Sequence, residues 1–267
     1  MQLNKDFKFA ANLSLLFSEF PILERAKVAR EYGFENAEFW WPFESATPSE
    51  REIEVFIESI SSSGINLVAL NFAAGNISNG DRGLIADPAL KEEFCESVSI
   101  LSHIADATGV RMFNLLAGNK NRALGAEIQE KTAAENIEFA IEKIAQPLGA
   151  KILIEQCNAL DNPNYRLPLP EDAARIVEKF PQDLGIVFDT YHCAKAGFIP
   201  AEIYSRYSAN IAHIQLADSP GRGEPGTGAI DFQPLFTEIK KSGYKGYISL
   251  EYKPVGDTKV GLNSLTI

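Results

Sequence analysis

The chain has 267 residues, of which 45% are hydrophobic, and its formal net charge is −11 at pH 7. This length suits either two modest domains or one α/β barrel of roughly 250 residues. The hydrophobic content excludes a disordered chain, and the acidic charge argues against a nucleic-acid partner, because proteins that bind the phosphate backbone present a basic face. A small anionic substrate is compatible with this charge if a few basic residues gather in the site.

The sequence carries no sign of a membrane or export segment. No apolar run approaches the roughly 20 residues that span a bilayer, and residues 1–6 have none of the features of a signal peptide. The three cysteines, Cys95, Cys157 and Cys193, show no metal-type spacing, so we expect free thiols. We therefore expect a cytoplasmic protein without membrane or nucleic-acid partners, and leave a homo-oligomer open.

A short apolar run followed by a longer amphipathic run recurs along the chain. The predicted strands are residues 7–13, 34–40, 65–71, 110–116, 150–155, 185–189, 211–217 and 247–251. Helices with apolar residues every three or four positions are predicted at residues 49–63, 88–108, 132–146 and 232–241. Several helices end on a glycine that leads into the next strand, because glycine accepts the left-handed conformation that closes a last turn. These glycines are Gly33, Gly64, Gly109, Gly149 and Gly243.

Eight alternations of strand and helix predict parallel pairing with right-handed crossovers. No linker or low-complexity tract divides the chain, so we expect one domain over residues 1–267. Eight units favour a closed (β/α)₈ TIM barrel over an open doubly wound sheet. The loop after the first strand has no Gly-x-Gly-x-x-Gly, which weakens a dinucleotide-binding interpretation.

Four polar residues stand at the ends of successive predicted strands, where such barrels place their reactive groups. They are Glu155, Asp189, Gln215 and Glu251, each separated from the next by about one βα unit. Closure of the barrel brings them round one point, where converging carboxylates repel and a divalent cation would neutralise them. This all-oxygen set suits Mg²⁺ or Mn²⁺ better than zinc. The alternative is that each carboxylate pairs with a basic residue or caps a loop. This alternative would explain a single polar residue at one strand end, but it does not explain four of them at corresponding strand ends.

Other residues near these strand ends suggest substrate contacts. His192 follows Asp189 by three residues and is a candidate to donate a hydrogen bond to a substrate oxygen. Arg222 lies in a glycine-rich loop, where its guanidinium can clamp a carboxylate through two parallel bonds. The alternatives are a packed loop histidine and a solvated arginine. His213 is better explained as a core histidine, and Cys157 is not needed as a ligand because the oxygen set suffices.

Five segments carry a resemblance to a known family, which covers almost the whole chain. They are residues 9–17 (Phe-Ala-Ala-Asn-Leu-Ser-Leu-Leu-Phe), 188–192 (Phe-Asp-Thr-Tyr-His), 214–218 (Ile-Gln-Leu-Ala-Asp), 222–228 (Arg-Gly-Glu-Pro-Gly-Thr-Gly) and 251–254 (Glu-Tyr-Lys-Pro). Together they resemble the hydroxypyruvate isomerase family, within the xylose-isomerase-like TIM barrels. The resemblance implies an aldose–ketose type isomerase that interconverts hydroxypyruvate and 2-hydroxy-3-oxopropanoate, or a related small oxo acid. It also implies that Glu155 and Glu251 form the proton-transfer pair.

The chemistry fits these residues independently of the resemblance. Moving a carbonyl to the neighbouring carbon requires removal of a proton beside the carbonyl, through an enediolate, and its return to the other carbon. Two carboxylates on different sides of the ring can face the two carbons. A metal that contacts both substrate oxygens would stabilise the developing negative charge.

The chain departs from the family pattern at three places that surround the substrate. Gln156 stands where the family has proline, Leu70 replaces a histidine before Asn71, and Asn119 stands where the family has lysine. We expect Asn71 and Lys120 to contact the substrate, with Lys120 still reaching its carboxylate. The core of the predicted site is intact, so these changes bear on which substrate is used.

The sequence is compatible with several alternative functions. A 2-oxo-tetronate isomerase or a ketose 3-epimerase uses similar chemistry, although the epimerases usually carry a histidine ligand where Gln215 stands. A hydrolase of the endonuclease IV type needs many histidines, and this chain has three. A sugar-acid-binding barrel without activity is the alternative outside the enzymes, and the intact Glu155 and Glu251 argue against it.

Overall fold

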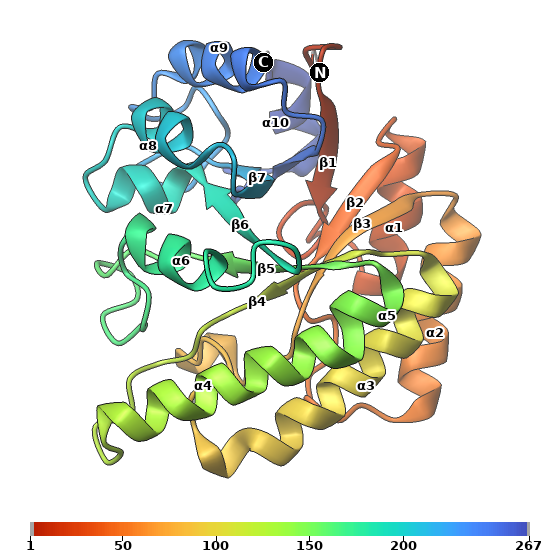
Figure 1. Ribbon diagram of the computed structural model, residues 1–267. Coiled ribbons are helices and arrows are strands. Elements are labelled where there is room, and N and C mark those ends of the chain that lie inside the picture. The colour runs from red at the N-terminus through yellow and green to blue at the C-terminus, as the bar shows by residue number, and fades with distance from the viewer. Residues whose placement is uncertain (1–2, 266–267) are drawn as a thin grey trace.

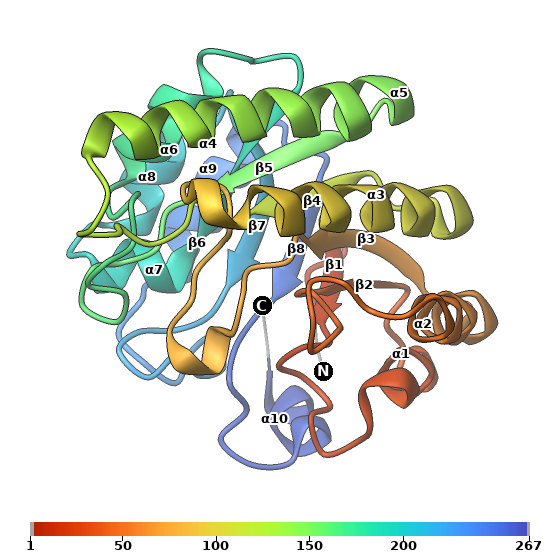
Figure 2. The same ribbon diagram turned by 90° about the horizontal axis from the view of Figure 1, so that it is seen from below.

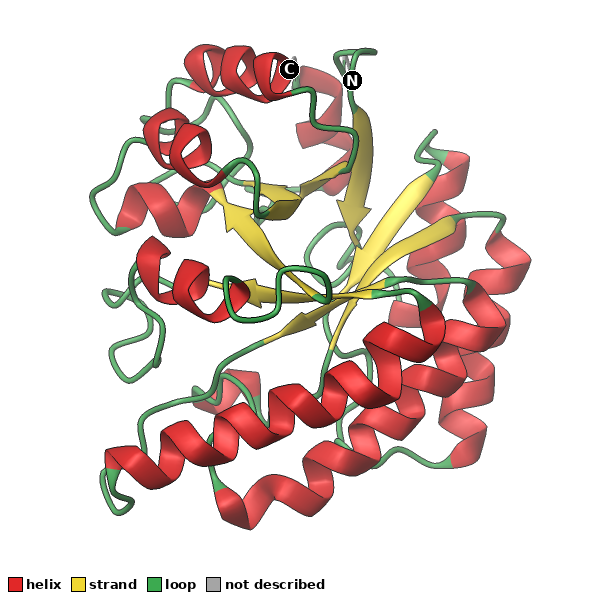
Figure 3. Ribbon diagram, in the orientation of Figure 1, coloured by secondary structure: helices red, strands yellow, loops and turns green. Residues whose placement is uncertain are grey.

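The computed structural model describes residues 3–265, and its eight strands form a closed parallel barrel in which each strand pairs with the next. The barrel closes where β1 pairs with β8, with Ala11 beside Leu250. Figures 1 and 3 show the strands in the centre with the helices outside them. The strands are β1 (Lys8–Asn12), β2 (Asn36–Phe39), β3 (Asn66–Asn71), β4 (Met112–Leu115), β5 (Lys151–Glu155), β6 (Leu184–Asp189), β7 (Ile211–Leu216) and β8 (Tyr247–Leu250).

Helices follow the strands and cover the outside of the barrel. They are α1 (Ile22–Glu31), α2 (Glu50–Ser63), α3 (Lys91–Thr108), α4 (Ala126–Ala140), α5 (Gln146–Leu148), α6 (Pro170–Val177), α7 (Thr190–Lys195), α8 (Pro200–Tyr207), α9 (Phe232–Ser242) and α10 (Thr258–Ser264). Two 3₁₀ turns, Ile77–Asn79 and Pro88–Leu90, lie between β3 and α3, and a π-helical segment, Ile141–Ala145, joins α4 to α5. No helix within residues 3–265 is long and apolar enough to cross a membrane.

The predicted TIM barrel is confirmed, and the ends of all eight predicted strands lie within two residues of the observed ones. Ser49 and Glu52 form the capping box that begins α2, and Gly64 ends the same helix with φ of 70°. Gly109 ends α3 in the same way, with φ of 80°. The helix predicted from residue 132 instead begins at Ala126, because its first turns are polar and give no apolar periodicity.

Helix α10 lies against the loop between β1 and α1, apart from the helices that follow the other strands (Figure 2). The backbone N–H of Phe17 donates to the hydroxyl of Thr258 at 2.8 Å. The hydroxyl of Tyr32 donates to the carbonyl of Lys259 at 3.0 Å. The last described segment is therefore tied to the first βα unit.

Buried polar side chains gather at the carboxyl ends of the strands, although the core of the molecule is apolar. One stands at or near the end of every strand, and none is more than 7% exposed. In chain order they are Asn12, Glu38, Asn71, Asn114, Glu155, Asp189, Gln215 and Glu251. Because buried polar groups need partners, this ring is the place to look for a functional site.

Candidate active site

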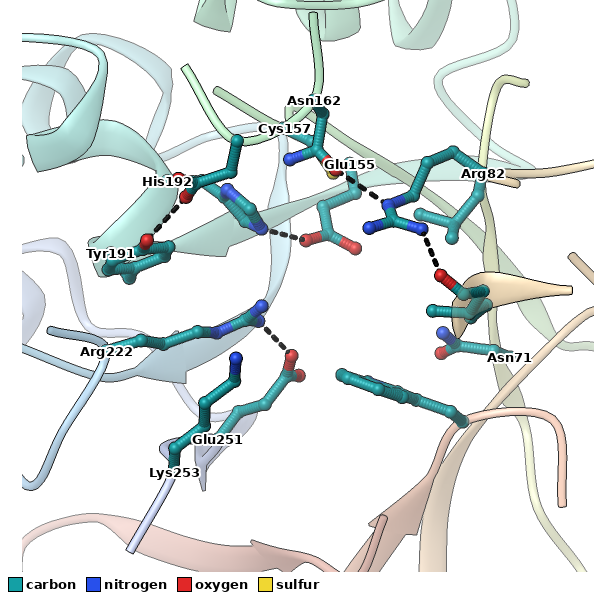
Figure 4. Close-up of a pocket in the computed structure, with 14 residues that line it drawn as sticks. Asn71, Arg82, Glu155, Cys157, Asn162, Tyr191, His192, Arg222, Glu251 and Lys253 are labelled. Atoms are coloured by element: carbon teal, nitrogen blue, oxygen red, sulfur yellow. Dashed lines mark hydrogen bonds and ion pairs between the residues drawn. The ribbon is translucent and has the colours of Figure 1, made fainter. Parts of the chain in front are cut away.

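A cavity of about 350 Å³ opens at the carboxyl end of the barrel. Figure 4 shows Glu155 and Glu251 reaching into it from different sides, with His192 and Arg222 on the wall formed by the later strands. Asn71 and Arg82 form part of the opposite wall. This volume is at the small end of the range for ligand sites and suits a compact, polar substrate.

Glu155 ends β5 and is fixed at both its backbone and its side chain. The amide of Asn114 donates to Glu155 Oε2 at 2.6 Å, and the hydroxyl of Tyr165 donates to the Glu155 carbonyl at 3.0 Å. Burial and the neighbouring Asp189 carboxylate raise the pKa of Glu155 to about 7, although the Asn114 hydrogen bond opposes this shift. A carboxyl group in this range can both accept and donate a proton near neutral pH.

Glu251 follows β8 and forms an ion pair with Arg222. Arg222 Nη2 lies 2.5 Å from Glu251 Oε1 and 3.3 Å from Asp189 Oδ2. Burial raises the pKa of Glu251 well above its ordinary value, although Arg222 lowers it. The arginine therefore links the carboxylates of β6 and β8 across the edge of the cavity.

The backbone and side chain of Arg222 are both held in an unusual position. Its φ is 56°, in the left-handed region that side chains other than glycine rarely adopt. Its guanidinium carbon lies 5.3 Å from the centre of the Tyr191 ring and 6.0 Å from that of Trp40, within cation–π range. Strained backbone of this kind persists where the surroundings over-determine it, often at functional sites.

Asp189 serves two purposes at the end of β6. Its Oδ1 accepts the backbone N–H groups of Tyr191 at 2.7 Å and His192 at 3.1 Å, and so caps α7. With Oδ1 occupied in this way, Oδ2 faces Arg222 and also His192 Nε2, which is 3.9 Å away. His192 Nε2 also lies 3.8 Å from Glu155 Oε1, and burial lowers the pKa of His192 to about 4. A neutral His192 is thus placed between two carboxylates.

Gln215 is the register partner of Asp189 and belongs to a buried network beneath the cavity. Its Nε2 donates to Glu38 Oε1 at 2.9 Å, and its own Oε1 is buried with no hydrogen-bond partner in the described part of the chain. Glu38 Oε2 lies 2.5 Å from His213 Nε2, and Asn12 donates to both Glu38 and Glu251 at 2.8 and 3.0 Å. Burial would raise the pKa of Glu38, but His213 and the amide donors outweigh it and lower the pKa.

The charges and donors of this region fit a divalent cation. Glu155, Asp189 and Glu251 are buried carboxyl groups, and Arg222 is the cation that contacts them in the part of the chain that the structure describes. One guanidinium faces three carboxyl groups, and the raised pKa values of Glu155 and Glu251 show that their ionised forms lack full compensation. The side-chain carbonyl oxygen of Gln215, which has no hydrogen-bond partner among the described residues, is available as a further ligand. A tighter group is formed by Glu155, Cys157 and His192, whose donor atoms lie within 4.8 Å of one another. Burial raises the pKa of the Cys157 thiol well above its ordinary value, which disfavours thiolate ligation there.

Most of the residues selected from the sequence meet at this site. Hydrogen bonds and close contacts connect Glu155, Asp189, Gln215, Glu251, His192 and Arg222, and Asn71 lines the same cavity. Lys120 is exposed and does not line this cavity, and it borders a separate depression beside Asp87 and Asn121. Lys120 lies in the loop between β4 and α4, where its backbone N–H donates to the Asn164 carbonyl at 2.7 Å. This contact holds the loop so that Lys120 lies outside the cavity.

Sequence reasoning missed several residues of the site. Asn12 and Asn114 stand at strand ends, so the rule that identified the carboxylates also applies to them, but a neutral amide is a weaker signal than a buried charge. Arg82 and Lys253 lie on loops that line the cavity. The Asp81-Arg82-Gly83 sequence is the available signal for Arg82, since Gly83 permits a close approach of two loops.

Comparisons with known proteins agree with this architecture. A family model described as xylose isomerase-like TIM barrel matches residues 26–266. The hydroxypyruvate isomerase of Escherichia coli is 32% identical over 96% of each chain. The 2-oxo-tetronate isomerase of Haemophilus influenzae is 30% identical over 96% of this chain and 97% of its own length. A crystal structure of an AP endonuclease of family 2 from Brucella melitensis is 30% identical, covers 96% of each chain and superimposes with a TM-score of 0.85.

Proposed function

Because the chain belongs to the xylose isomerase-like TIM barrels and, within them, to the hydroxypyruvate isomerase family, we propose that it interconverts hydroxypyruvate and 2-hydroxy-3-oxopropanoate, or a closely related small oxo acid. The chain is an isomerase, and the proposal concerns its substrate and mechanism. The observation that carries the proposal is that Glu155 and Glu251 face one small cavity from different strands. A substrate between them would present one reacting carbon to each carboxylate.

The reaction then follows as two proton transfers. One glutamate removes a proton from C3 of hydroxypyruvate, the C–H electron pair forms the C2–C3 double bond, and the C2 oxygen takes the negative charge. The other glutamate delivers a proton to C2, while the C3 hydroxyl becomes a carbonyl and its proton passes to the C2 oxygen. Atoms and charge balance, and each glutamate exchanges roles in the reverse direction.

The other polar groups position the substrate and its charge. His192 is neutral and lies beside Glu155, where it can donate a hydrogen bond to a substrate oxygen. Arg222 contacts Glu251 and Asp189, so its guanidinium can stabilise the enediolate oxygen next to Glu251. Glu155, Asp189, Gln215 and Glu251 would hold a divalent cation, Mg²⁺ or Mn²⁺, which would act as a Lewis acid toward the substrate oxygens.

A four-carbon acid is the second candidate substrate. A relative named as a 2-oxo-tetronate isomerase has nearly the same identity to this chain as the hydroxypyruvate isomerase does. The cavity of about 350 Å³ has room for one further hydroxymethyl group. The same pair of glutamates would serve either acid, because the reacting carbons are the same two beside the carboxylate.

Other functions are less compatible with the site. A net charge of −11 disfavours a DNA substrate, and the cavity is lined by one histidine, His192, among the described residues. His213 lies beneath it against Glu38, and His103 is on the exposed face of α3. A binding protein without activity would not need two buried carboxyl groups facing its ligand, since burying them is costly.

An NMR screen in D₂O tests the proposal directly. Three- and four-carbon oxo acids are incubated with the protein and Mg²⁺ or Mn²⁺, and samples without protein control for spontaneous exchange. We expect protein-dependent deuterium incorporation at C3 of hydroxypyruvate or 2-oxo-tetronate, together with the isomerised product. Exchange with ketoses alone would instead indicate an epimerase, and binding without any exchange would indicate a binding barrel.

A further inference from the structure

Arg82 lies on the wall of the cavity opposite His192 and Arg222, and several hydrogen bonds fix its guanidinium (Figure 4). Its Nε donates to Asn162 Oδ1 at 2.7 Å, and its Nη1 donates to the carbonyl oxygens of Ile77 at 3.0 Å and Asp81 at 2.6 Å. These bonds occupy the Nε and Nη1 atoms of the guanidinium. Within residues 3–265, no hydrogen bond or ion pair is found for Nη2, so its two N–H groups are available on the side of the cavity (Figure 4).

The loop that carries Arg82 is locked to its neighbours. The N–H of Gly118 donates to the Arg82 carbonyl at 2.8 Å, and the N–H of Gly83 donates to the Ala74 carbonyl at 2.9 Å. A Cβ on Gly83 would lie 2.1 Å from the Leu116 carbonyl oxygen, so only glycine permits this approach. The orientation of the guanidinium is therefore set before any ligand arrives, which lowers the entropy lost on binding.

The two arginines of the cavity differ in how their charge is compensated. Arg222 contacts the carboxylates of both Glu251 and Asp189, so a substrate carboxylate placed on it would meet two like charges. Among residues 3–265, the hydrogen-bond partners of the Arg82 side chain are all neutral: the amide of Asn162 and two backbone carbonyls. Of the two arginines, Arg82 is therefore the one whose charge an anionic ligand can neutralise without displacing a protein carboxylate. Lys253 also lines the cavity, but it is exposed and its ammonium is a point charge on a flexible stem rather than a fixed fork of donors.

We propose that Arg82 binds the carboxylate of the substrate and makes the enzyme selective for oxo acids over neutral hydroxy ketones. The amide of Asn71 lines the same wall and supplies a second donor to that carboxylate (Figure 4). With the carboxylate held there, C2 and C3 extend toward Glu155 and Glu251. Asn162 acts as a positioning residue through the Arg82 Nε bond. This assignment rests on the proposed isomerase function only for the identity of the acid.

Kinetics on a charged and a neutral substrate test the assignment. Hydroxypyruvate and dihydroxyacetone share the hydroxy-ketone group and differ in the carboxylate. Arg82→Gln should raise KM for hydroxypyruvate about 10- to 100-fold, as expected for loss of a charged hydrogen bond, with a smaller effect on kcat. It should leave deuterium exchange into dihydroxyacetone unchanged. Arg82→Lys keeps the charge but loses the fixed orientation, so its KM should lie between those of the wild type and Arg82→Gln.

Two further variants make the result specific. Arg122 is exposed in the loop after β4, and Arg122→Gln removes the same charge away from the cavity, so its KM should match the wild type. The sequence suggested both Arg222 and Lys120 as carboxylate ligands; Arg222 already contacts two protein carboxylates, and Lys120→Gln tests the other residue. An unchanged KM in a folded Arg82→Gln, or a KM increase caused by Lys120→Gln in its place, would overturn the assignment. Thermal unfolding of each variant establishes that it is folded, and Arg82→Lys replaces Arg82→Gln in the comparison if the glutamine variant is not.

Equilibrium binding separates this inference from the proposed function. D-Glycerate, a carboxylate analogue that cannot isomerise, is titrated into the wild type and Arg82→Gln and followed by NMR. A 10-fold or larger loss of affinity, in line with a charged contact, supports Arg82 even if no oxo acid is turned over. Equal affinity for the two proteins contradicts it even if the wild type isomerises hydroxypyruvate rapidly.

Discussion

The two halves of the barrel mouth carry polar residues of different kinds. The strands β5 to β8 contribute three carboxyl groups and one amide, at Glu155, Asp189, Gln215 and Glu251. The strands β1 to β4 contribute three amides and one carboxylate, and that carboxylate, Glu38, is paired with His213 below the cavity. The strands β5 to β8 therefore carry the carboxyl groups that can transfer protons. The strands β1 to β4 carry mainly amides, which donate hydrogen bonds that orient those carboxyl groups.

This division has a physical consequence for each half. Buried carboxyl groups with uncompensated charge have shifted pKa values and attract cations or protons, so they suit proton transfer. Amides keep the same charge at every pH, and they orient a carboxylate without changing its protonation directly. Asn12 and Asn114 both donate to carboxylates of the second half, at 3.0 Å to Glu251 and at 2.6 Å to Glu155.

The largest effects are expected from the two glutamates of the second half. Glu155→Gln and Glu251→Gln keep a neutral oxygen but remove the basic carboxylate, so each should lower kcat by about 10² or more. Deuterium exchange by NMR should vanish in the variant that lacks the abstracting base, while the other retains some exchange without net isomerisation. Full rescue of both variants by excess Mg²⁺ or Mn²⁺ would show instead that these glutamates are ligands only.

Metal binding should distinguish Asp189 from the glutamates. Asp189→Asn keeps the side-chain shape but removes charge, so we expect the apparent affinity for Mn²⁺ to fall by about 10-fold or more, with activity partly restored at high Mn²⁺. The thermal shift on Mn²⁺ titration measures this without relying on turnover. Cys157→Ser should leave the titration unchanged, and a shift caused by Cys157→Ser rather than Asp189→Asn would move the ion to the group formed by Glu155, Cys157 and His192.

A substitution at Glu38 tests whether the strands β1 to β4 contribute to catalysis by orienting the carboxyl groups of the other half. Glu38→Gln breaks a buried pair with His213, so it should cost about 3–5 kcal/mol of unfolding free energy and lower kcat by about 10-fold, less than either catalytic glutamate. Urea unfolding and steady-state kinetics measure the two effects. The exposed pair of Glu54 and His103 at 2.7 Å is a matched control, and Glu54→Gln should cost less than about 1 kcal/mol. Equal costs at the two positions would mean that the buried pair has no special role.

The sequence was sufficient to predict the barrel and the carboxyl groups at the ends of β5, β6 and β8. Strand and helix periods are local, so the eight units follow from short windows, and a carboxylate at the end of an apolar strand is conspicuous. Contacts across the barrel are not local. The pairing of Glu38 with His213 joins residues 175 positions apart, and a lone glutamate in β2 gives no sign of it.

Loop residues were harder to assign for a different reason. Lys120 and Arg82 are both basic and both follow strands of the first half, but the direction of each side chain depends on contacts with other loops. Arg82 is turned toward the cavity by Asn162, which comes from the segment between β5 and α6. Lys120 is paired through its backbone with Asn164 of the same segment and remains exposed. Charge and position along the chain did not distinguish these two residues.

The smallest effect is expected at Asn114, which orients a catalytic group without carrying charge. Its amide donates to Glu155 Oε2 at 2.6 Å, and its removal leaves Glu155 beside a cavity that water can enter. Because a water molecule can replace the lost donor, Asn114→Ala should lower kcat by no more than about 10-fold. Asn66→Ala is the control, since Asn66 begins β3 at the opposite end of the barrel and should not alter kcat. If Asn114→Ala were as damaging as Glu155→Gln, the amide would be needed for the reaction itself, and the division between a reacting half and an orienting half would no longer hold.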